Sequence, residues 1–474
     1  MLYPTLEFAL FFIFIFALYW LLKKRFRTKT LLIINYFFYG FFDVRFLVLL
    51  FFYTCVVYLL GQKMAQAHKS HQKYYLYVGV FISLSQLGIF KYLDFFRELT
   101  DHLLTFLGVS WPMPAVEFIF PVGVSFFTFQ ALTYLFAIAD GQRSQAATFI
   151  NLATFISFFP SISAGPICRA KDLLTQIEQG GQDSPIKPYQ AMSLLFIGAF
   201  KKVVVSSYLS TQWVQPVFND PSHFSASTII CAVYAYTMQI YCDFSGYSDM
   251  TIAVAQLLGF GLKNNFESPY LATNLKIFWR RWHISLSSFI RDYLYIRLGG
   301  SQQKTLFRTS LNLIFCMLAS GLWHGAHVRY LIWGGLHGLG VVILSFYQKL
   351  NIYPRIQSYT WLQRSYLLIA WLLTFNYVAC LWIFFRADSL AQALSVIEGI
   401  THTHWTMDLS FYKFMAGLLL GFVALFLGPK IKDKLTQSIE YCPVLIKPVL
   451  VTVYVYIIIT LGPQGIPPFI YFQY

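Results

Sequence analysis

Long apolar runs separated by short polar loops make up nearly the whole of this sequence. A helix that crosses a membrane needs about 20 mostly apolar residues, and fewer where protein shields it. Thirteen runs approach that length, near residues 5–22, 30–42, 44–61, 74–92, 116–139, 189–213, 226–241, 248–262, 308–326, 329–347, 362–386, 410–428 and 445–461. Because several runs are short or interrupted, the pattern predicts about 11 to 13 crossing and re-entrant helices in one polytopic, all-α domain over residues 1–474.

Glycine and proline interrupt the apolar pattern at two places. Residues 120–123 read Phe-Pro-Val-Gly, and residues 159–166 read Phe-Pro-Ser-Ile-Ser-Ala-Gly-Pro. Non-helical backbone is tolerated at membrane depth only where protein or a water-filled cavity shields it. These breaks therefore predict segments that enter the membrane without crossing it.

Residues 274–300 follow a different pattern from the apolar runs. Trp279, Trp282, Leu286, Phe289 and Tyr293 recur at steps of three or four, which places them on one face of a helix. The stretch also carries six charged residues: Lys276, Arg280, Arg281, Arg291, Asp292 and Arg297. Each would cost about 2.5–3.5 kcal/mol at the bilayer centre. We therefore expect an amphipathic helix that lies at the membrane surface or lines a wet cavity.

The composition excludes a soluble protein. Hydrophobic residues make up 57% of the chain and charged residues only 12%, about half the charge of a typical soluble domain. The net charge of +15 does not indicate a nucleic-acid partner, because the bases lie in short loops between apolar runs. Seven cysteines without a CxxC pair suggest neither a disulfide framework nor a zinc site.

The basic residues instead predict the orientation of the chain. Five of the seven residues from Lys23 to Lys29 are Lys or Arg, and such clusters stay on the cytoplasmic side. The first apolar run has no preceding basic region and no small-residue cleavage site, so we interpret it as a retained membrane span. The N-terminus is then expected outside the cytoplasm.

Histidines are the main candidates for chemistry. His324 ends an apolar run, with His327 and His337 soon after, and an ionisable group at membrane depth is a candidate functional residue. For His324 the alternative is that the side chain caps or hydrogen-bonds a buried helix end. For His283 the sequence alone favours a histidine at the membrane interface. Because no Asp or Glu occurs between Tyr293 and Ala387, a local metal site or Ser-His-Asp triad is disfavoured. The remaining candidate for the chemistry is a neutral imidazole that acts as a general base.

Two acidic residues form a second polar group. Asp243 and Asp249 lie in the polar stretch at residues 241–249, where the predicted runs at 226–241 and 248–262 meet. They are a helix cap and a loop acid, or residues that line a cavity. The chain contains no GxGxxG, P-loop or HExxH motif, so nothing in the sequence indicates nucleotide hydrolysis or metalloprotease chemistry.

Several stretches that contain these residues are similar to the sequences of the membrane-bound O-acyltransferases, and in particular of the bacterial branch that acetylates alginate or peptidoglycan. The matching stretches are residues 120–130, 241–249, 268–274, 278–287, 291–295, the core Trp323-His324-Gly325, and the closing residues 469–474. A Trp-His-Gly triplet alone is weak evidence, but the ordered series over nearly the whole chain is specific.

The resemblance implies a fold, an activity and a location. In that family tilted helices form a ring around a thinned centre with a funnel from each face, in the bacterial inner membrane. The histidine that matches His324 is catalytic, and the one that matches His283 is a second functional position. Acetyl-CoA is the expected cytoplasmic co-substrate, with no tightly bound cofactor. An extracytoplasmic SGNH-type transferase is the expected partner, so contact with the polysaccharide acceptor would be indirect.

Three assignments stay open at this stage. Arg280 and Arg281 offer CoA phosphates a favourable field, but they suit lipid headgroups equally well. D-alanyl transfer from a carrier protein to teichoic acid is the task of a close branch of the same family. A small-solute transporter also uses broken helices and intramembrane histidines, although no internal repeat is visible here.

Overall fold

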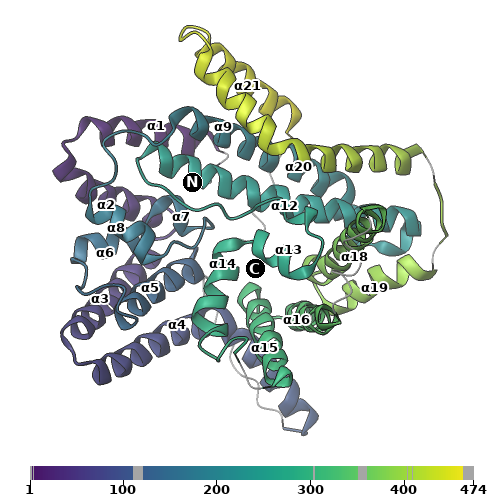
Figure 1. Ribbon diagram of the computed structural model, residues 1–474, viewed down its shortest axis with the longest axis horizontal. Helices are drawn as coiled ribbons and strands as arrows, with labels where there is room; N and C mark the ends of the chain where they lie inside the picture. Colours follow the sequence, from purple (N-terminus) through teal and green to yellow (C-terminus); the bar gives the residue numbers. More distant parts are fainter. Residues whose placement is uncertain are drawn as a thin grey trace. The chain divides into compact units, whose positions relative to one another are not determined.

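The computed structural model describes residues 3, 5–109, 121–302, 305–350, 360–402, 404–407 and 409–462. All regular elements in these residues are helical, which confirms the predicted all-α class (Figure 1). The chain forms two compact units: unit 1 is Met1–Met192 with Met250–Lys263, and unit 2 is Ser193–Asp249 with Asn264–Tyr474. The single domain over residues 1–474 and the ring of helices around a funnel stay predictions.

Unit 1 is built mainly from the N-terminal helices. They are α1 (Leu6–Leu21), α2 (Lys24–Gly40), α3 (Val44–Gln66), α4 (Lys69–Phe106), α5 (Val124–Ala139), α6 (Phe149–Ile156), α7 (Phe159–Ile162), η1 (Ala170–Leu174) and α8 (Thr175–Glu178). Helix α5 is buried on all sides, and most of its residues are apolar. It begins at Gly123, which has φ +74° and whose Cβ would lie 2.1 Å from the carbonyl oxygen of Ile162. Only glycine fits this start.

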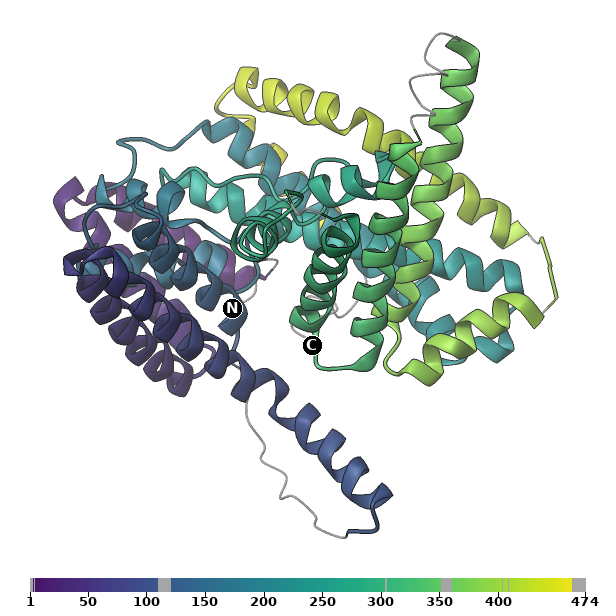
Figure 2. The ribbon, with the colours of Figure 1, turned by 60° about the horizontal axis from the view of Figure 1, so that its bottom comes forward.

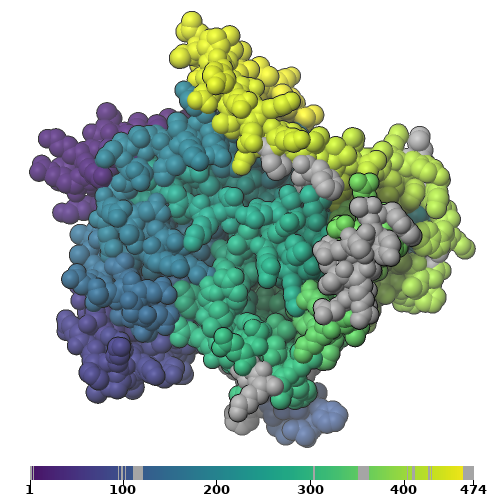
Figure 3. Space-filling view, in the orientation of Figure 1, coloured from purple at the N-terminus to yellow at the C-terminus, as the bar shows by residue number. Residues whose placement is uncertain are grey.

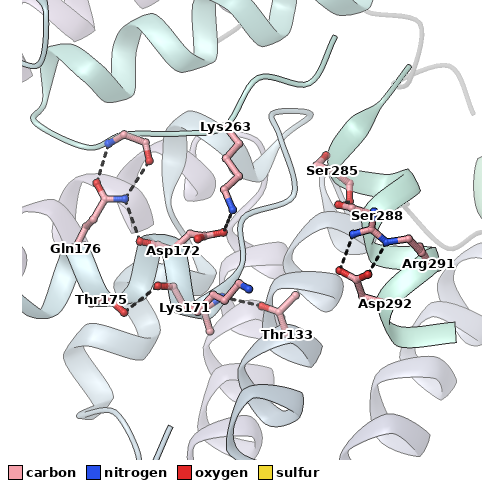
Figure 4. Close-up of polar contacts among 12 residues, drawn as sticks. Thr133, Lys171, Asp172, Thr175, Gln176, Lys263, Ser285, Ser288, Arg291 and Asp292 are labelled. Carbon is pink, nitrogen blue, oxygen red and sulfur yellow. Dashed lines mark hydrogen bonds and ion pairs between the residues drawn. The ribbon is translucent and has the colours of Figure 1, made fainter. Parts of the chain in front are cut away.

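Polar contacts fix the last segment of unit 1. The Lys263 ammonium pairs with the Asp172 carboxylate of η1 at 2.6 Å (Figure 4). The Gln176 side chain donates to the carbonyl of Gly261 at 3.0 Å and accepts from its N–H at 2.7 Å. Residues 261–263, which follow the end of a long helix, are thereby held against η1 and α8.

Unit 2 contains the rest of the chain. Its elements begin within α9 (Pro188–Ala199) and continue with η2 (Phe200–Ser206), α10 (Ser207–Leu209), η3 (Ser210–Val214), α11 (Gln215–Asn219), η4 (Pro221–His223), α12 (Ala226–Leu257), η5 (Pro269–Leu271), α13 (Leu275–Arg281), α14 (Ile284–Ile290), η6 (Arg291–Tyr295), α15 (Leu306–His324), α16 (Val328–Lys349), α18 (Thr360–Arg386), α19 (Leu390–His402), α20 (Leu409–Tyr441) and α21 (Lys447–Leu461). The last eight residues of α12 belong to unit 1.

Six segments of the described chain are long and apolar enough to cross a membrane. They are Val44–Gln66, Lys69–Leu93, Pro188–Asn219, Leu306–His324, Val328–Lys349 and Leu362–Arg386. Shorter apolar helices accompany them, among them α1, α5 and α21. The apolar side chains of α20 and α21 are largely exposed, and α21 has no buried residue (Figure 3). Exposed apolar helices are costly in water and stable in lipid, so the chain is a multi-pass membrane protein.

Two sequence predictions need correction. The runs at 226–241 and 248–262 belong largely to one continuous helix, α12, because the polar side chains between them have partners inside unit 2. The amphipathic helix predicted over residues 274–300 is divided into α13, α14 and η6, with a left-handed residue, His283, between the first two. Residues 159–166 form the short helix α7 and the turn that follows, and their re-entrant path stays a prediction.

Helices α15 and α16 form a closely packed antiparallel pair, joined by residues 325–327 (Figure 2). Glycine lies wherever the two backbones approach. A Cβ at Gly321 would be 2.2 Å from the carbonyl oxygen of Tyr330, and a Cβ at Gly334 would be 2.4 Å from that of Met317. Small residues at such spacing let membrane helices approach through their backbones. The tight pairing holds His324, the last residue of α15, at the turn.

The close packing predicts that alanine is destabilising at one of two adjacent glycines and tolerated at the other. Gly334→Ala should destabilise the protein by about 1–3 kcal/mol, because its methyl group would overlap backbone. Gly335→Ala is the matched control, since its Cβ would lie 3.4 Å from Leu318 Cδ2, an ordinary contact. Thermal unfolding of both variants in detergent measures the difference, and equal melting temperatures would contradict the packing argument.

Candidate functional site

His324 is buried in unit 2, with 2% of its surface exposed. Its ring lies edge-on to Trp333 at 5.1 Å and to Phe385 at 5.0 Å, and Trp323 packs beside it at 4.8 Å. The residue that follows, Gly325, has room for no side chain, because a Cβ there would lie 2.2 Å from the Tyr330 ring. The imidazole is therefore enclosed by aromatic rings at the turn between α15 and α16.

His283 is fully buried in the same unit and joins α13 to α14. Its backbone has φ +42° and ψ +56°, a left-handed conformation that is uncommon for a residue with a side chain. Such strain costs about 1–3 kcal/mol and persists only where the surroundings enforce it. The interfacial histidine that the sequence alone favours is wrong, because this ring is inside the protein.

Hydrogen bonds hold both sides of the His283 turn. Its Nδ1 lies 3.2 Å from the Oδ1 of Asn265, and the same oxygen accepts from the N–H of Ser285 at 3.0 Å. The N–H of Ile284 donates to the carbonyl of Asn265 at 2.9 Å. Burial lowers the pKa of His283 to about 3, so the ring is neutral at any ordinary pH.

A tryptophan connects the two histidines. The Trp323 ring lies 4.8 Å from the His324 ring and 5.7 Å from the His283 ring. The structure therefore brings together the two residues that the resemblance singles out, although they lie 41 positions apart in the sequence. Two imidazoles in a cluster of aromatic rings are suited to general base catalysis, since the rings keep water from the reacting groups.

The other two histidines of this region differ in position. His327 is exposed at the start of α16, and it does not join His324 in the site. His337 is fully buried against Trp333 at 4.9 Å and Trp279 at 5.0 Å. No group of three His, Cys, Asp or Glu side chains in the described residues could hold a metal ion. Cys316 is buried on α15 as a packing residue.

The predicted anion-binding arginines end α13. Arg280 is exposed and Arg281 partly buried, on the last turn of that helix. Lys276 lies one turn earlier, where its side chain donates to Gln348 at 2.7 Å. Burial and the neighbouring Arg280 charge lower the pKa of Lys276. The α13 helix thus concentrates positive charge close to the turn at His283.

Asp243 and Asp249 lie within α12 and are each paired with a lysine. The Asp243 carboxylate pairs with Lys202, and both side chains are 4% exposed. Asp249 pairs with Lys201 at 2.7 Å in a partly exposed position. Neither acid is a helix cap or a loop acid, because α12 is continuous through both. No local pattern predicts these pairs, since the lysines lie more than 40 residues before the acids.

Sequence reasoning missed three residues that build the site. Asn265 holds His283, and Trp333 and Phe385 enclose His324. Two of the three are aromatic residues in apolar runs, where core packing is the ordinary interpretation. Asn265 lies in the polar stretch Lys263–Asn265, which reads as a loop. A buried role for it could be found only once the partner segments were known.

Comparison with known proteins agrees with this geometry. The sequence pattern of the membrane-bound O-acyltransferase family matches residues 137–374, about half of the chain. A probable alginate O-acetylase of Pseudomonas aeruginosa is 35% identical over 81% of this chain and 71% of its own length. A peptidoglycan O-acetyltransferase of Helicobacter pylori is 33% identical over 79% of this chain and 74% of its own length. A teichoic acid D-alanyltransferase of Bacillus subtilis is 27% identical over 58% of this chain and 72% of its own length.

The buried ion pair predicts a large loss of stability when one partner is neutralised and a recovery when both partners are replaced by apolar residues. Asp243→Asn leaves the Lys202 ammonium buried without its counter-charge and should cost about 3–5 kcal/mol. Asp249→Asn is the control and should cost about 0–1 kcal/mol, because that pair is partly exposed. The double variant Lys202→Met with Asp243→Leu should recover stability. Folded yield by size-exclusion chromatography in detergent measures all three, and a tolerated Asp243→Asn would refute the assignment.

Proposed function

This chain belongs to the membrane-bound O-acyltransferase family and is an acyltransferase, and from that premise we propose that it moves acetyl groups from cytoplasmic acetyl-CoA across the bacterial inner membrane. The acetyl group then serves the O-acetylation of an envelope polysaccharide, either peptidoglycan or an exopolysaccharide such as alginate. The main support is the enclosure of His324 beside His283 in a chain that resembles acetylating enzymes over most of its length.

The proposed chemistry assigns the general base to His324. A hydroxyl of the acyl acceptor gives its proton to the imidazole while its oxygen attacks the thioester carbonyl carbon. The carbon–sulfur bond then breaks, and the departing thiolate takes up the proton from the imidazolium. His283, whose ring lies 5.7 Å from the Trp323 ring, is proposed as a second polar contact to the reacting groups. The dry aromatic surroundings protect the thioester from hydrolysis.

The donor is proposed as a co-substrate that no residue binds tightly. Arg280 and Arg281, with Lys276 one turn away, offer the phosphates of CoA a positive field at the end of α13. Lipid headgroups carry the same phosphate chemistry, so these arginines suit either ligand. An SGNH-type transferase outside the cytoplasm is proposed to pass the acetyl group on to the polymer.

D-alanyl transfer is the second candidate, and the similarity to the teichoic acid enzyme of Bacillus subtilis favours it over unrelated chemistries. Its donor would be a carrier protein rather than free CoA. The higher identity and longer coverage of the acetylating relatives favour acetyl transfer. Purified protein given acetyl-CoA, or a D-alanyl carrier protein, separates the two, and a solute transporter would release no CoA.

Replacing His324 tests the proposed base. His324→Ala should lower acetyl transfer about 10²–10⁴-fold, because no other group takes the proton. His327→Ala is a matched control three residues away, since that side chain is exposed. CoA release from acetyl-CoA in detergent, and polymer O-acetylation in cells, measure the effect at equal protein levels.

Either of two results would count against this role. Retained transfer in His324→Ala would remove the base from this residue, and equal losses in both variants would indicate a general disturbance of the turn.

The proposed orientation has its own test. Lys23, Lys24, Arg25, Arg27 and Lys29 should remain in the cytoplasm, with the N-terminus outside and the protein in the inner membrane. A reporter enzyme fused after Lys29 should therefore read cytoplasmic. A second reporter fused after Ala139, beyond α5, gives a signal with which the first can be compared. A periplasmic signal from the fusion after Lys29 would reverse the proposed topology.

A further inference from the structure

We propose that Asn265 is a positioning residue that fixes His283 as the Nδ1–H tautomer, so that Nε2 is the acceptor nitrogen of the ring. The assignment of the tautomer stands on geometry alone, whereas its effect on turnover rests on the proposed acyl transfer. Asn265 lies outside the stretches whose residue types suggest chemistry, and its role follows only from the contacts around the turn.

The orientation of the Asn265 amide is fixed by a backbone group. The N–H of Ser285 lies 3.0 Å from the amide atom assigned as Oδ1, and the Ser285 hydroxyl donates to the same atom at 2.9 Å. A backbone N–H can only donate, so the atom that faces it is the oxygen and not the NH2 group. The His283 Nδ1, 3.2 Å from that oxygen, must therefore donate to it.

The backbone of Asn265 fixes the turn from the other direction. Its carbonyl accepts from the N–H of Ile284, and two residues later the N–H of Glu267 donates to the carbonyl of Arg281 at 3.0 Å. Residues 265–267 thus run beside residues 281–284 and support the left-handed backbone at His283. One residue determines both where the ring lies and which nitrogen carries its proton.

Burial makes the choice of nitrogen decisive. Asn265 is 1% exposed and His283 is fully buried, and the depressed pKa of His283 keeps the ring neutral. A neutral imidazole has one N–H, so a proton on Nδ1 leaves Nε2 as an acceptor. An amide achieves this without charge, whereas a carboxylate at the same place would favour the imidazolium.

The titratable groups on the helices that pack against His283 do not change the assignment of its tautomer. Helix α12 presents the Phe244 ring to His283 at 4.7 Å, and the adjacent Asp243 is paired with Lys202. Helix α15 presents Trp323, with His324 beyond it. Two groups lie within hydrogen-bond distance of Nδ1: the Asn265 oxygen at 3.2 Å and the Ser285 hydroxyl at 3.4 Å. The Ser285 hydroxyl gives its own proton to the Asn265 oxygen at 2.9 Å, so it is left as an acceptor towards Nδ1 and agrees with a proton on that nitrogen.

Two variants of Asn265 test the proposal. Asn265→Leu removes the acceptor and keeps the branched shape of the side chain, and Asn265→Asp keeps the acceptor and adds a charge. Ring 15N shifts of histidine-labelled protein, with the His283 signal assigned from His283→Gln, should show Nδ1–H in the wild type and in Asn265→Asp. Asn265→Leu should lose that signature and lower kcat about 10–100-fold with little change in the KM for acetyl-CoA.

The pH profile separates positioning from simple support of the fold. Asn265→Asp should retain measurable turnover and shift the acidic limb of kcat upward by about 1–3 pH units, because the carboxylate stabilises the protonated ring. Asn35→Ala is the matched control: Asn35 is also fully buried and accepts from the N–H of Phe159 at 3.1 Å, within unit 1. The folded fraction of that variant should keep the wild-type kcat, pH profile and His283 signal.

The outcomes distinguish this proposal from the proposed function. Unchanged His283 ring shifts in Asn265→Leu would overturn the tautomer assignment whether or not the protein transfers acetyl groups. A changed tautomer with wild-type kcat would overturn the positioning role. Wild-type protein that shows the Nδ1–H signature but transfers no acetyl group would instead defeat the proposed function and leave the assignment of the tautomer in place.

Discussion

A polar group kept from water must find its partner inside the protein, and this constraint explains most of the organisation around the site. Asp243 would be costly within α12 if Lys202 did not meet it, and the strained backbone of His283 would not persist without the bonds from Asn265. Each of these two side chains therefore has a specific segment brought to it. The helical backbone is broken at His283, whereas α12 continues through Asp243.

The aromatic side chains have the complementary role of excluding water. Trp323, Trp333 and Phe385 surround the His324 ring, and Trp323 also covers His283. Glycines at positions 321 and 334 allow this enclosure, because they let α15 and α16 approach closely enough to hold the turn. An acyl thioester that reached these rings would meet proton acceptors but little water, which is the condition that transfer to a hydroxyl requires.

The sequence predicted the class of the fold and part of the site. Apolar runs of membrane length correctly gave an all-α, multi-pass protein, and the resemblance correctly gave the family. The division of residues 274–300 was missed, because a period of three to four residues continues across His283 even though the backbone does not. The contacts of Asp243 and Asn265 were unreadable for a related reason: both depend on partners distant in sequence or on a turn that no local pattern specifies.

The π-helical geometry of η2 limits how this membrane segment can vary in length. Adjacent lysines of this π-helical turn, Lys201 and Lys202, pair with carboxylates six positions apart on α12, Asp249 and Asp243. Deleting a single residue between Phe200 and Ser206 would relax the turn but rotate the following chain by about 100°. Replacing Lys202 alone would leave the Asp243 carboxylate buried without its counter-charge, and a deletion just before the two lysines would turn both ammonium groups away from α12. The length of this segment and the identity of its lysines are therefore constrained together.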